Sequence, residues 1–289
     1  MNLTAVAGPL AEPISLAEAK AHLQVTETDR DSLITTMIAA ARAQAETYTG
    51  RALITRTLDL RLDAWPGSGT WFTRAALTVP PVREQGIWIP RPPLRSITSI
   101  TYIDQNGATQ TWSSSLYTVD AQTEPGRIEP AYGEVWPVIR EQMNAIKVRF
   151  VCGHATKFTA AAATDLVTAS GHALADTDVT QLSFSGGEDA ALPASLALNT
   201  DYYARDVTAG TSLKLAATSG GAAIDITDAG TATASFFLGV VPREIRQAML
   251  LMIGDMYAHR EDTVMGVNPA SLPRGVESLL WPHRLMKFA

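Results

Sequence analysis

The sequence predicts an α+β protein: a helical bundle with a small antiparallel β unit, plus an inserted all-β domain. Apolar residues recur with helical spacing near both ends of the chain, and they alternate with polar residues in its middle. Composition changes abruptly between about residues 156 and 239, which are rich in Ala, Thr, Ser, Gly and Asp. With 289 residues, of which 46% are apolar, the chain is long enough for two domains.

The N-terminal part predicts two helices after a loose arm. Ser15 and Glu18 have the spacing of a capping box, in which each side chain satisfies the other residue's free N–H, so a short helix should follow. Thr28 and Asp31 repeat this spacing before a longer helix, which Gly50 is well placed to end. One face of the longer helix is apolar and rich in small residues: Ile34, Met37, Ile38, Ala41, Ala45 and Tyr48.

The middle of the chain predicts short antiparallel strands. Leu58, Leu60 and Leu62 alternate with charged residues, which is typical of a strand with one wet face. Asn106 and Gly107 supply the positive φ angles of a tight hairpin turn. The expected strands lie near residues 58–62, 87–89, 99–104, 109–112, 116–120, 127–129 and 145–151. Five tryptophans beside these signals are expected to pack sheets and not to stack on sugars or bases: Trp65, Trp71, Trp88, Trp112 and Trp136.

The compositionally distinct stretch predicts a compact all-β module. Short alternating runs occur at 182–185, 202–207, 212–216 and 224–227. Because the stretch lies between a strand and a helix, we interpret it as an insertion at an exposed loop. The expected domains are residues 1–155 together with 240–289, and the inserted module at 156–239.

Residues 241–260 predict a helix of about five turns. Pro242 suits its first turn and Arg260 its last, and its natural partner is the alanine-rich helix before Gly50. The apolar stripe is wider than one packing face needs, so we expect it to contact another subunit as well. The expected interface residues are Ile245, Met249, Leu250, Leu251, Met252 and Met256.

Charge and cysteine content exclude several classes of protein. The net charge of −6 argues against a protein that grips nucleic acid by neutralising phosphates. Cys152 is the only cysteine, so a disulfide within the chain and a cysteine-based zinc site are both excluded. The N-terminus has no basic segment followed by a long apolar run, and no uncharged apolar run reaches membrane-spanning length, so we expect neither a signal peptide nor a membrane partner.

The sequence contains no assembled catalytic set. Asp255 and His259 stand four residues apart and could share a metal, but two ligands without a third favour a solvated pair at the helix end. Cys152 and His154 are too close in sequence to act readily as a thiol and its base, so a half-buried cysteine at a strand end is the better interpretation. Phosphate-loop, serine-hydrolase and zinc-protease motifs are missing. We therefore predict no catalytic residue, no metal and no cofactor.

Ten segments follow one another in a recognisable order: Pro13–Lys20, Ile38–Arg42, Tyr48–Leu53, Pro90–Leu94, Ser99–Tyr102, Pro125–Ile128, Trp136–Pro137, Val148–Phe150, Val241–Ala248 and Leu272–Leu280. This order resembles the head–tail connector (adaptor) family of tailed bacteriophages and related gene-transfer particles. The resemblance covers roughly residues 13 to 153 and 240 to 285. It departs from the family at the 156–239 insertion and at Cys152-Gly153-His154, where an Ala-Gly-Tyr type ending is commoner.

The resemblance implies a non-enzymatic structural protein of the virion neck, assembled in the host cytoplasm. It implies a homo-oligomeric ring, commonly of twelve copies, bound beneath the portal protein and above a stopper or tail-completion protein. Genomic DNA would pass through the ring without sequence-specific binding, and an acidic lumen would repel its phosphates.

The C-terminal segment is the expected portal contact. Family members seat this segment on the portal, and the last nine residues of the chain place large apolar side chains beside basic ones, an end that is unfavourable in water. The expected portal-binding residues are Leu272, Val276, Leu279, Leu280, Trp281, Arg284, Leu285, Met286 and Phe288.

Three alternatives remain open. Among virion proteins, the chain could be a tail-completion or tail-terminator ring. The inserted module could bind host-surface carbohydrate, with Tyr202 and Tyr203 as stacking candidates. A hydrolase would require Asp255 and His259 to meet a third polar group in a pocket.

Overall fold

The computed structural model describes residues 2–9, 11–66, 86–185, 191–198, 200–232, 234–259 and 274–285. The chain divides into two compact units. The first contains Met1–Gly8 and Arg56–Gly153, and the second contains Pro9–Thr55 and His154–Ala289. Helices and antiparallel sheets are both present, so the predicted α+β class is confirmed.

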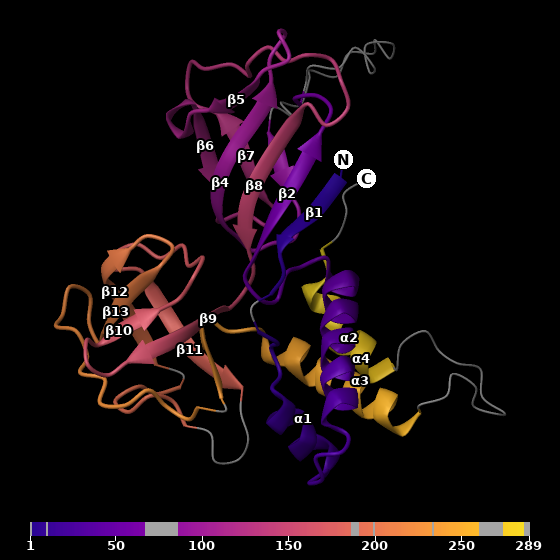
Figure 1. Ribbon diagram of the computed structural model, residues 1–289, viewed down its shortest axis with the longest axis vertical. Coiled ribbons are helices and arrows are strands. Elements are labelled where there is room, and N and C mark those ends of the chain that lie inside the picture. Colours follow the sequence, from indigo (N-terminus) through magenta and orange to yellow (C-terminus); the bar gives the residue numbers. More distant parts are fainter. Residues whose placement is uncertain are drawn as a thin grey trace. The chain divides into compact units, whose positions relative to one another are not determined.

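The described part of the first unit contains two antiparallel sheets. Its larger sheet has the order β1-β2-β8-β4-β5, with β1 at Asn2–Ala7, β2 at Arg56–Leu62, β8 at Ile146–Cys152, β4 at Leu94–Ile103 and β5 at Thr109–Trp112 (Figure 1). The smaller sheet has the order β3-β7-β6, with β3 at Ile87–Ile89, β7 at Gly126–Pro130 and β6 at Tyr117–Asp120, preceded by a 3-10 turn at Ser114–Leu116. The hairpin predicted at Asn106-Gly107 joins β4 to β5, but the expectation of a positive φ at both residues is wrong, because only Gly107, at φ +86°, has one.

Alternation decides which side of the larger sheet is the core. Leu60 and Val148 are fully buried, whereas Arg149, next to Val148 on β8, lies on the opposite face and pairs with the Asp59 carboxylate through Nε and Nη2 at 2.8 and 2.9 Å. This bidentate bond holds the pKa of the Asp59 carboxyl below its usual range, although burial of the carboxyl opposes the shift. The face of the sheet opposite the core therefore carries an ion pair between Asp59 and Arg149.

The expectation of a loose N-terminal arm is wrong for residues 2–7. These residues form the edge strand β1, which pairs with β2 from Asn2 opposite Arg61 to Ala7 opposite Thr57. Most of the side chains of β1 are exposed, so it lacks the apolar alternation that identifies a strand in sequence. Backbone hydrogen bonds to β2, which depend on tertiary position, create this strand.

Within the described residues of the second unit, four helices pack around one apolar core. They are α1 at Leu16–Leu23, α2 at Asp31–Thr49, α3 at Arg243–Ala258 and α4 at Arg274–Leu280, followed by a 3-10 turn at Trp281–His283 (Figure 1). The predicted pairing of α2 with α3 is confirmed, and α1 and α4 pack on α3 too. Gly50 ends α2 with φ +76°, as expected of a left-handed C-cap.

The cap predicted at Thr28 and Asp31 is wrong. Arg30 occupies the N-cap position of α2 and makes no side-chain cap. The Asp31 carboxylate instead forms an ion pair with Lys20 of α1 at 2.7 Å, and this contact connects the two helices. The sequence has the spacing of a capping box, but the Asp31 carboxylate binds Lys20 and not the N-terminus of α2.

The remaining strands of the second unit close into a six-stranded barrel of order β10-β13-β12-β11-β14-β9. They are β9 at Thr156–Ala161, β10 at Leu166–Thr168, β11 at Val179–Ser185, β12 at Asp201–Thr208, β13 at Ser212–Ala216 and β14 at Ser235–Leu238. The strand expected at 224–227 does not form. The buried Ile226 packs in the barrel core instead, and its N–H donates to the Asp165 carboxylate at 2.9 Å.

Candidate functional site

The apolar face of α3 is used mainly inside the chain. Of the six residues expected at a subunit interface, Ile245, Met249 and Met252 are buried in the helical core, so they offer no surface to a neighbouring copy in this structure. Leu250 and Met256 are partly buried against the same core, and only Leu251, at 38% exposed, points to solvent. The stripe is wide because α3 meets α1, α2 and α4 on different sides.

The C-terminal segment is divided between a buried and an exposed part. Val276 and Leu280 of α4 are fully buried, and Leu279 packs against the same core. Trp281 is 51% exposed and Arg284 is exposed as well. Of the other four residues expected at the portal, Leu285 is partly buried, while Leu272, Met286 and Phe288 lie outside the described residues.

The segment after α4 is fastened to the C-terminal end of α2. The Leu285 N–H donates to the carbonyl of Thr49 at 2.9 Å, and the Arg51 guanidinium donates through Nε to the carbonyl of His283 at 2.7 Å. A Cβ on Gly50 would lie 3.3 Å from Leu285 Cδ1, so this contact is close. These two hydrogen bonds fix the direction in which the chain leaves α4.

Arg284, in the segment after α4, is exposed and contacts two aromatic rings. Its guanidinium lies 5.5 Å from the ring centroid of Tyr48 and 5.6 Å from that of Trp281. Cation–π contacts at these distances hold a cation and two aromatic faces together at the surface. We call Tyr48, Trp281 and Arg284 the C-terminal corner. Its mixture of aromatic and guanidinium groups is typical of the energetic centres of protein interfaces.

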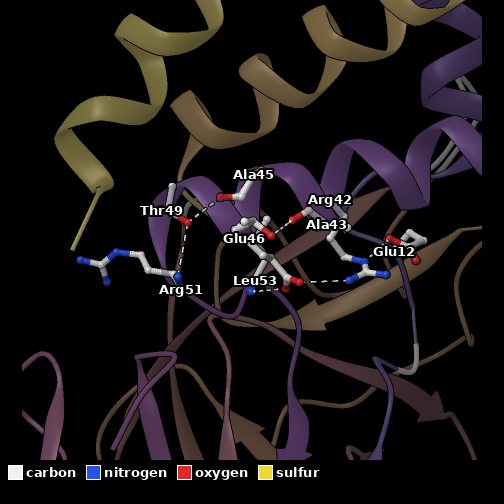
Figure 2. A network of polar contacts seen from close by, with 9 residues as sticks. Glu12, Arg42, Ala43, Ala45, Glu46, Thr49, Arg51 and Leu53 are labelled. Atoms are coloured by element: carbon white, nitrogen blue, oxygen red, sulfur yellow. Dashed lines mark hydrogen bonds and ion pairs between the residues drawn. The ribbon is translucent and has the colours of Figure 1, made fainter. Parts of the chain in front are cut away.

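A buried polar network holds the end of α2 that carries this corner. Arg42 donates through Nε to Glu12 at 2.7 Å and through Nη1 to Glu46 at 3.0 Å, and the Leu53 N–H donates to the other oxygen of Glu46 at 3.0 Å. Figure 2 shows Arg42 between the two carboxylates, with Leu53 reaching Glu46 from the following loop. The pKa of Arg42 is raised, because the two carboxylates outweigh the burial that acts against its charge. The network ties the N-terminal segment and the loop after α2 to one helix.

The barrel is attached to the helices through Glu18. The Arg246 guanidinium donates through Nη2 to both oxygens of Glu18 at 2.7 Å, and the Ser185 hydroxyl donates to Glu18 Oε2 at 2.7 Å. Ser15 Oγ accepts from the Glu18 N–H at 3.1 Å, so half of the predicted capping box is present. The reciprocal half is replaced, because Ser185 Oγ, and not Glu18, contacts the Ser15 N–H. A residue of the barrel thus completes the cap of α1.

The residues considered for chemistry are not assembled. Asp255 and His259 contact each other at 3.1 Å with more than half of each side chain exposed, which is the solvated pair at the helix end that was expected. Cys152 ends β8 as expected, but it is fully buried and not half-buried. Among the residues that the structure describes, no three His, Cys, Asp or Glu side chains are placed to hold a metal. No helix in the same ranges is long and apolar enough to cross a bilayer.

The carbohydrate alternative loses one of its two stacking candidates. Tyr202 is buried in the barrel core, and its hydroxyl accepts from the Ala197 N–H at 2.7 Å. A ring enclosed in this way cannot stack on a sugar. Trp65, Trp112 and Trp136 likewise pack with one another beside the larger sheet, as predicted for aromatic residues near strands, while Trp88 is half exposed.

The sequence prediction did not select the loop between β7 and β8, residues 131–145. This loop carries four large apolar side chains that are among the most exposed of the described chain: Tyr132, Val135, Val138 and Met143. Their spacing has neither a helical nor a strand period, so periodicity could not mark them. The signal available in sequence was an apolar run without a period between two strands.

Residues 13–125 match the family model described as phage gp6-like head-tail connector protein, which confirms the resemblance found in the sequence. The fold of the whole chain is similar to chains of three solved particle structures. A chain of the neck of an empty gene transfer agent particle computed with C6 symmetry has 16% sequence identity and a TM-score of 0.55. Chains of the virion of a native particle and of a native neck computed with C12 symmetry each have 17% identity, with TM-scores of 0.55 and 0.52. Each comparison covers 100% of this chain and 98% of the other. No curated protein matches the sequence significantly.

Proposed function

Because residues 13–125 match the head–tail connector family and the whole chain has the fold of proteins from particle necks, we propose that this protein is a head–tail connector. It is a structural protein of the virion that joins capsid to tail. The observation that carries the proposal is the agreement of two independent comparisons, one of sequence with a head–tail connector family and one of fold with proteins of particle necks.

The proposed organisation keeps the helices and the small β unit, residues 1–155 and 240–289, as the connector domain. The barrel, near 156–239, is an insertion in it. Its first and last strands support this division, since Thr156 of β9 lies opposite Leu238 of β14 and the chain therefore enters and leaves the barrel at one point. The similarity to neck proteins extends over the barrel as well as the rest of the chain.

The proposed assembly is a homo-oligomeric ring, with twelve copies as the expected number. Neck structures computed with C6 and C12 symmetry support copies arranged around an axis. The ring extends the channel for genomic DNA, with a stopper or tail-completion protein on its far side. A net charge of −6 suits a channel protein that must not retain a passing polyanion.

The C-terminal corner is the proposed contact with the portal. Val276, Leu279 and Leu280 cannot contact the portal directly while they remain in the core, so we assign them the role of holding α4 in place. Trp281 and Arg284 present the exposed aromatic and cationic groups. Leu272, Met286 and Phe288 keep their predicted role.

Portal binding by the C-terminal corner can be tested with a closely matched control. Trp281→Ala combined with Arg284→Ala should lower affinity for purified portal at least about tenfold, because interface aromatic and guanidinium groups each contribute more than about 1 kcal/mol. Trp88 and Arg127 form a second exposed tryptophan–arginine pair, at 6.0 Å, and Trp88→Ala with Arg127→Ala should leave binding unchanged. Co-sedimentation with portal measures both.

Equal binding by the two double variants would mean that the C-terminal corner is not part of the portal interface. Failure of the wild-type chain to bind portal at all would contradict the connector function. Electron microscopy of whole particles gives the decisive location, because a position farther along the tail would identify a tail-completion or terminator ring instead.

A further inference from the structure

The ring contact must lie somewhere other than the centre of α3. Ile245, Met249 and Met252 were expected to supply it but are enclosed within one chain. A ring still requires apolar surface that one copy buries against the next. The inference below rests on the proposed ring, and it concerns which part of the chain makes that contact.

The β7–β8 loop, residues 131–145, exposes more large apolar side chains than any other stretch of its length in the described chain. Tyr132 is 107% exposed, Met143 81%, Val135 79% and Val138 69%. The remaining exposed large apolar residues are scattered singly over the two units. Four such side chains together present roughly several hundred Å² of apolar surface, which is near the upper limit that monomeric proteins leave in water.

The loop is anchored to the rest of its unit at several points. The Trp136 ring stacks on Trp65 with 4.5 Å between centroids, and Trp65 Nε1 donates to the Pro137 carbonyl at 2.8 Å. The backbone is tied at two further places: the Arg140 N–H donates to the Ile103 carbonyl at 3.0 Å, and the Asn144 N–H donates to Asp63 at 2.7 Å. A loop anchored in this way loses little conformational entropy on binding.

The groups next to the apolar side chains in sequence suit a protein partner. Glu134, Arg140 and Glu141 are all exposed, so the loop carries charges of both signs beside its apolar side chains, as protein interfaces commonly do. The excess of carboxylates is unfavourable beside DNA phosphates. A single interface takes about 800 Å² from each partner, so the loop provides only part of one. Such an area is too small for a stable free dimer but fits a contact repeated around a closed ring.

We infer that residues 131–145 of one copy dock on a second copy of this chain in the assembled ring. Tyr132, Val135, Val138 and Met143 are the contact residues, and Trp136 is the positioning residue that presents them. The contact is head-to-tail, because copies related by a ring axis meet through two different surfaces.

Single cysteine variants can identify the occupant of the loop. Cys152 is fully buried, so Val138→Cys or Met143→Cys introduces the one accessible thiol of the described chain. Each variant is labelled with a benzophenone maleimide, assembled on portal, and irradiated. Thr118→Cys, exposed on β6 of the same unit, is the matched control. We expect cross-linked products of twice the 30.9 kDa chain mass from both loop variants and far less from the control.

The other outcomes separate this inference from the proposed function. If rings form on portal but the loop cross-links to portal or to another neck protein, or gives no product, the second copy is not the occupant and the inference is wrong while the connector function stands. If unlabelled wild-type chain forms no ring on portal, the proposed function fails. A second measurement covers variants that do not assemble: Val135→Glu with Val138→Glu should reduce ring formation at least tenfold with an unchanged unfolding midpoint, whereas Thr118→Glu should not.

Discussion

Glu18 is the residue at which the barrel and the helices meet. Its carboxylate accepts two hydrogen bonds from Arg246 and one from Ser185, and both ionic side chains are only about a quarter exposed. A carboxylate with three donors and little solvent is stabilised only while its partners remain. Glu18 is therefore one of the contacts that hold the barrel on α1 and α3, together with Phe237 of β14, which packs in the helical core.

Removing the cation should show this dependence. Arg246→Ala leaves the Glu18 charge partly buried without its main partner, so we expect a loss of about 2 kcal/mol in the free energy of unfolding. Asp255→Ala breaks an ion pair that is more than half exposed and should change stability by less than about 0.5 kcal/mol. Urea unfolding of both variants measures the difference. Equal, small losses would mean that the Glu18 contact does not hold the barrel.

Asp59 makes stability depend on pH. Its pKa is lowered by the Arg149 hydrogen bonds, so its contribution is fully present above the ordinary carboxyl pKa of about 4 and is lost as pH falls through the lower pKa of the folded state. Asp59→Asn should therefore be less stable than wild type at pH 7, and the gap should narrow below about pH 4. Urea midpoints from pH 7 to pH 3 test this, and a gap independent of pH would contradict it.

At the scale of elements, the C-terminal end of α2 is connected to several other segments of the helical unit. It carries the Arg42 network, the left-handed Gly50 and the contacts to the segment after α4. The exposed corner of Trp281 and Arg284 is held in place by these connections. An element end, and not an element face, thus supports the proposed portal contact.

Gly50→Ala tests that support. The substitution places a Cβ at φ +76°, which costs about 1 kcal/mol, and brings it to 3.3 Å from Leu285 Cδ1. Gly220→Ala has the same backbone problem at φ +69° but meets no atom within 4 Å, and Gly220 lies outside both proposed contacts. We expect both to lower the melting temperature, and Gly50→Ala alone to weaken portal binding, as measured by thermal unfolding and co-sedimentation. Identical behaviour of the two variants would show that the Leu285 contact is unimportant.

At the scale of the whole molecule, the first and last strands of the barrel, β9 and β14, are antiparallel neighbours. Lys157 lies opposite Phe237 in the β9–β14 pair, and Phe237 itself packs in the helical core. A two-residue turn could therefore join these two residues. The proposed separability of the barrel rests on this register.

Replacing residues 158–236 with Asn-Gly should leave a chain that unfolds in one cooperative transition with its helical content intact. The Glu18–Arg246 pair remains in this variant, although Ser185 is lost. Circular dichroism during thermal unfolding provides the measurement. A molten or aggregated product would mean that the barrel is an integral part of the helical unit and not an insertion.

Local patterns in the sequence were sufficient for most elements. Helical spacing located α2 and α3, alternation located β2 and β8, and Asn106-Gly107 located the β4–β5 hairpin, because each depends on neighbours within a few residues. The family resemblance carried the expected role further, to the neck of a particle. Burial and partner choice could not be obtained in this way.

Tertiary structure alone decided which surfaces remain free. The width of the α3 stripe indicated extra apolar contact, but only the packing of α1, α2 and α4 around it showed that the contact lies within the chain. In the same way, Ser185 and not Glu18 contacts the Ser15 N–H at the cap of α1. Residues 2–7 form a strand because they pair with β2. The physical reason is that periodicity records how one segment presents its side chains, whereas exposure depends on which distant segments arrive to cover them.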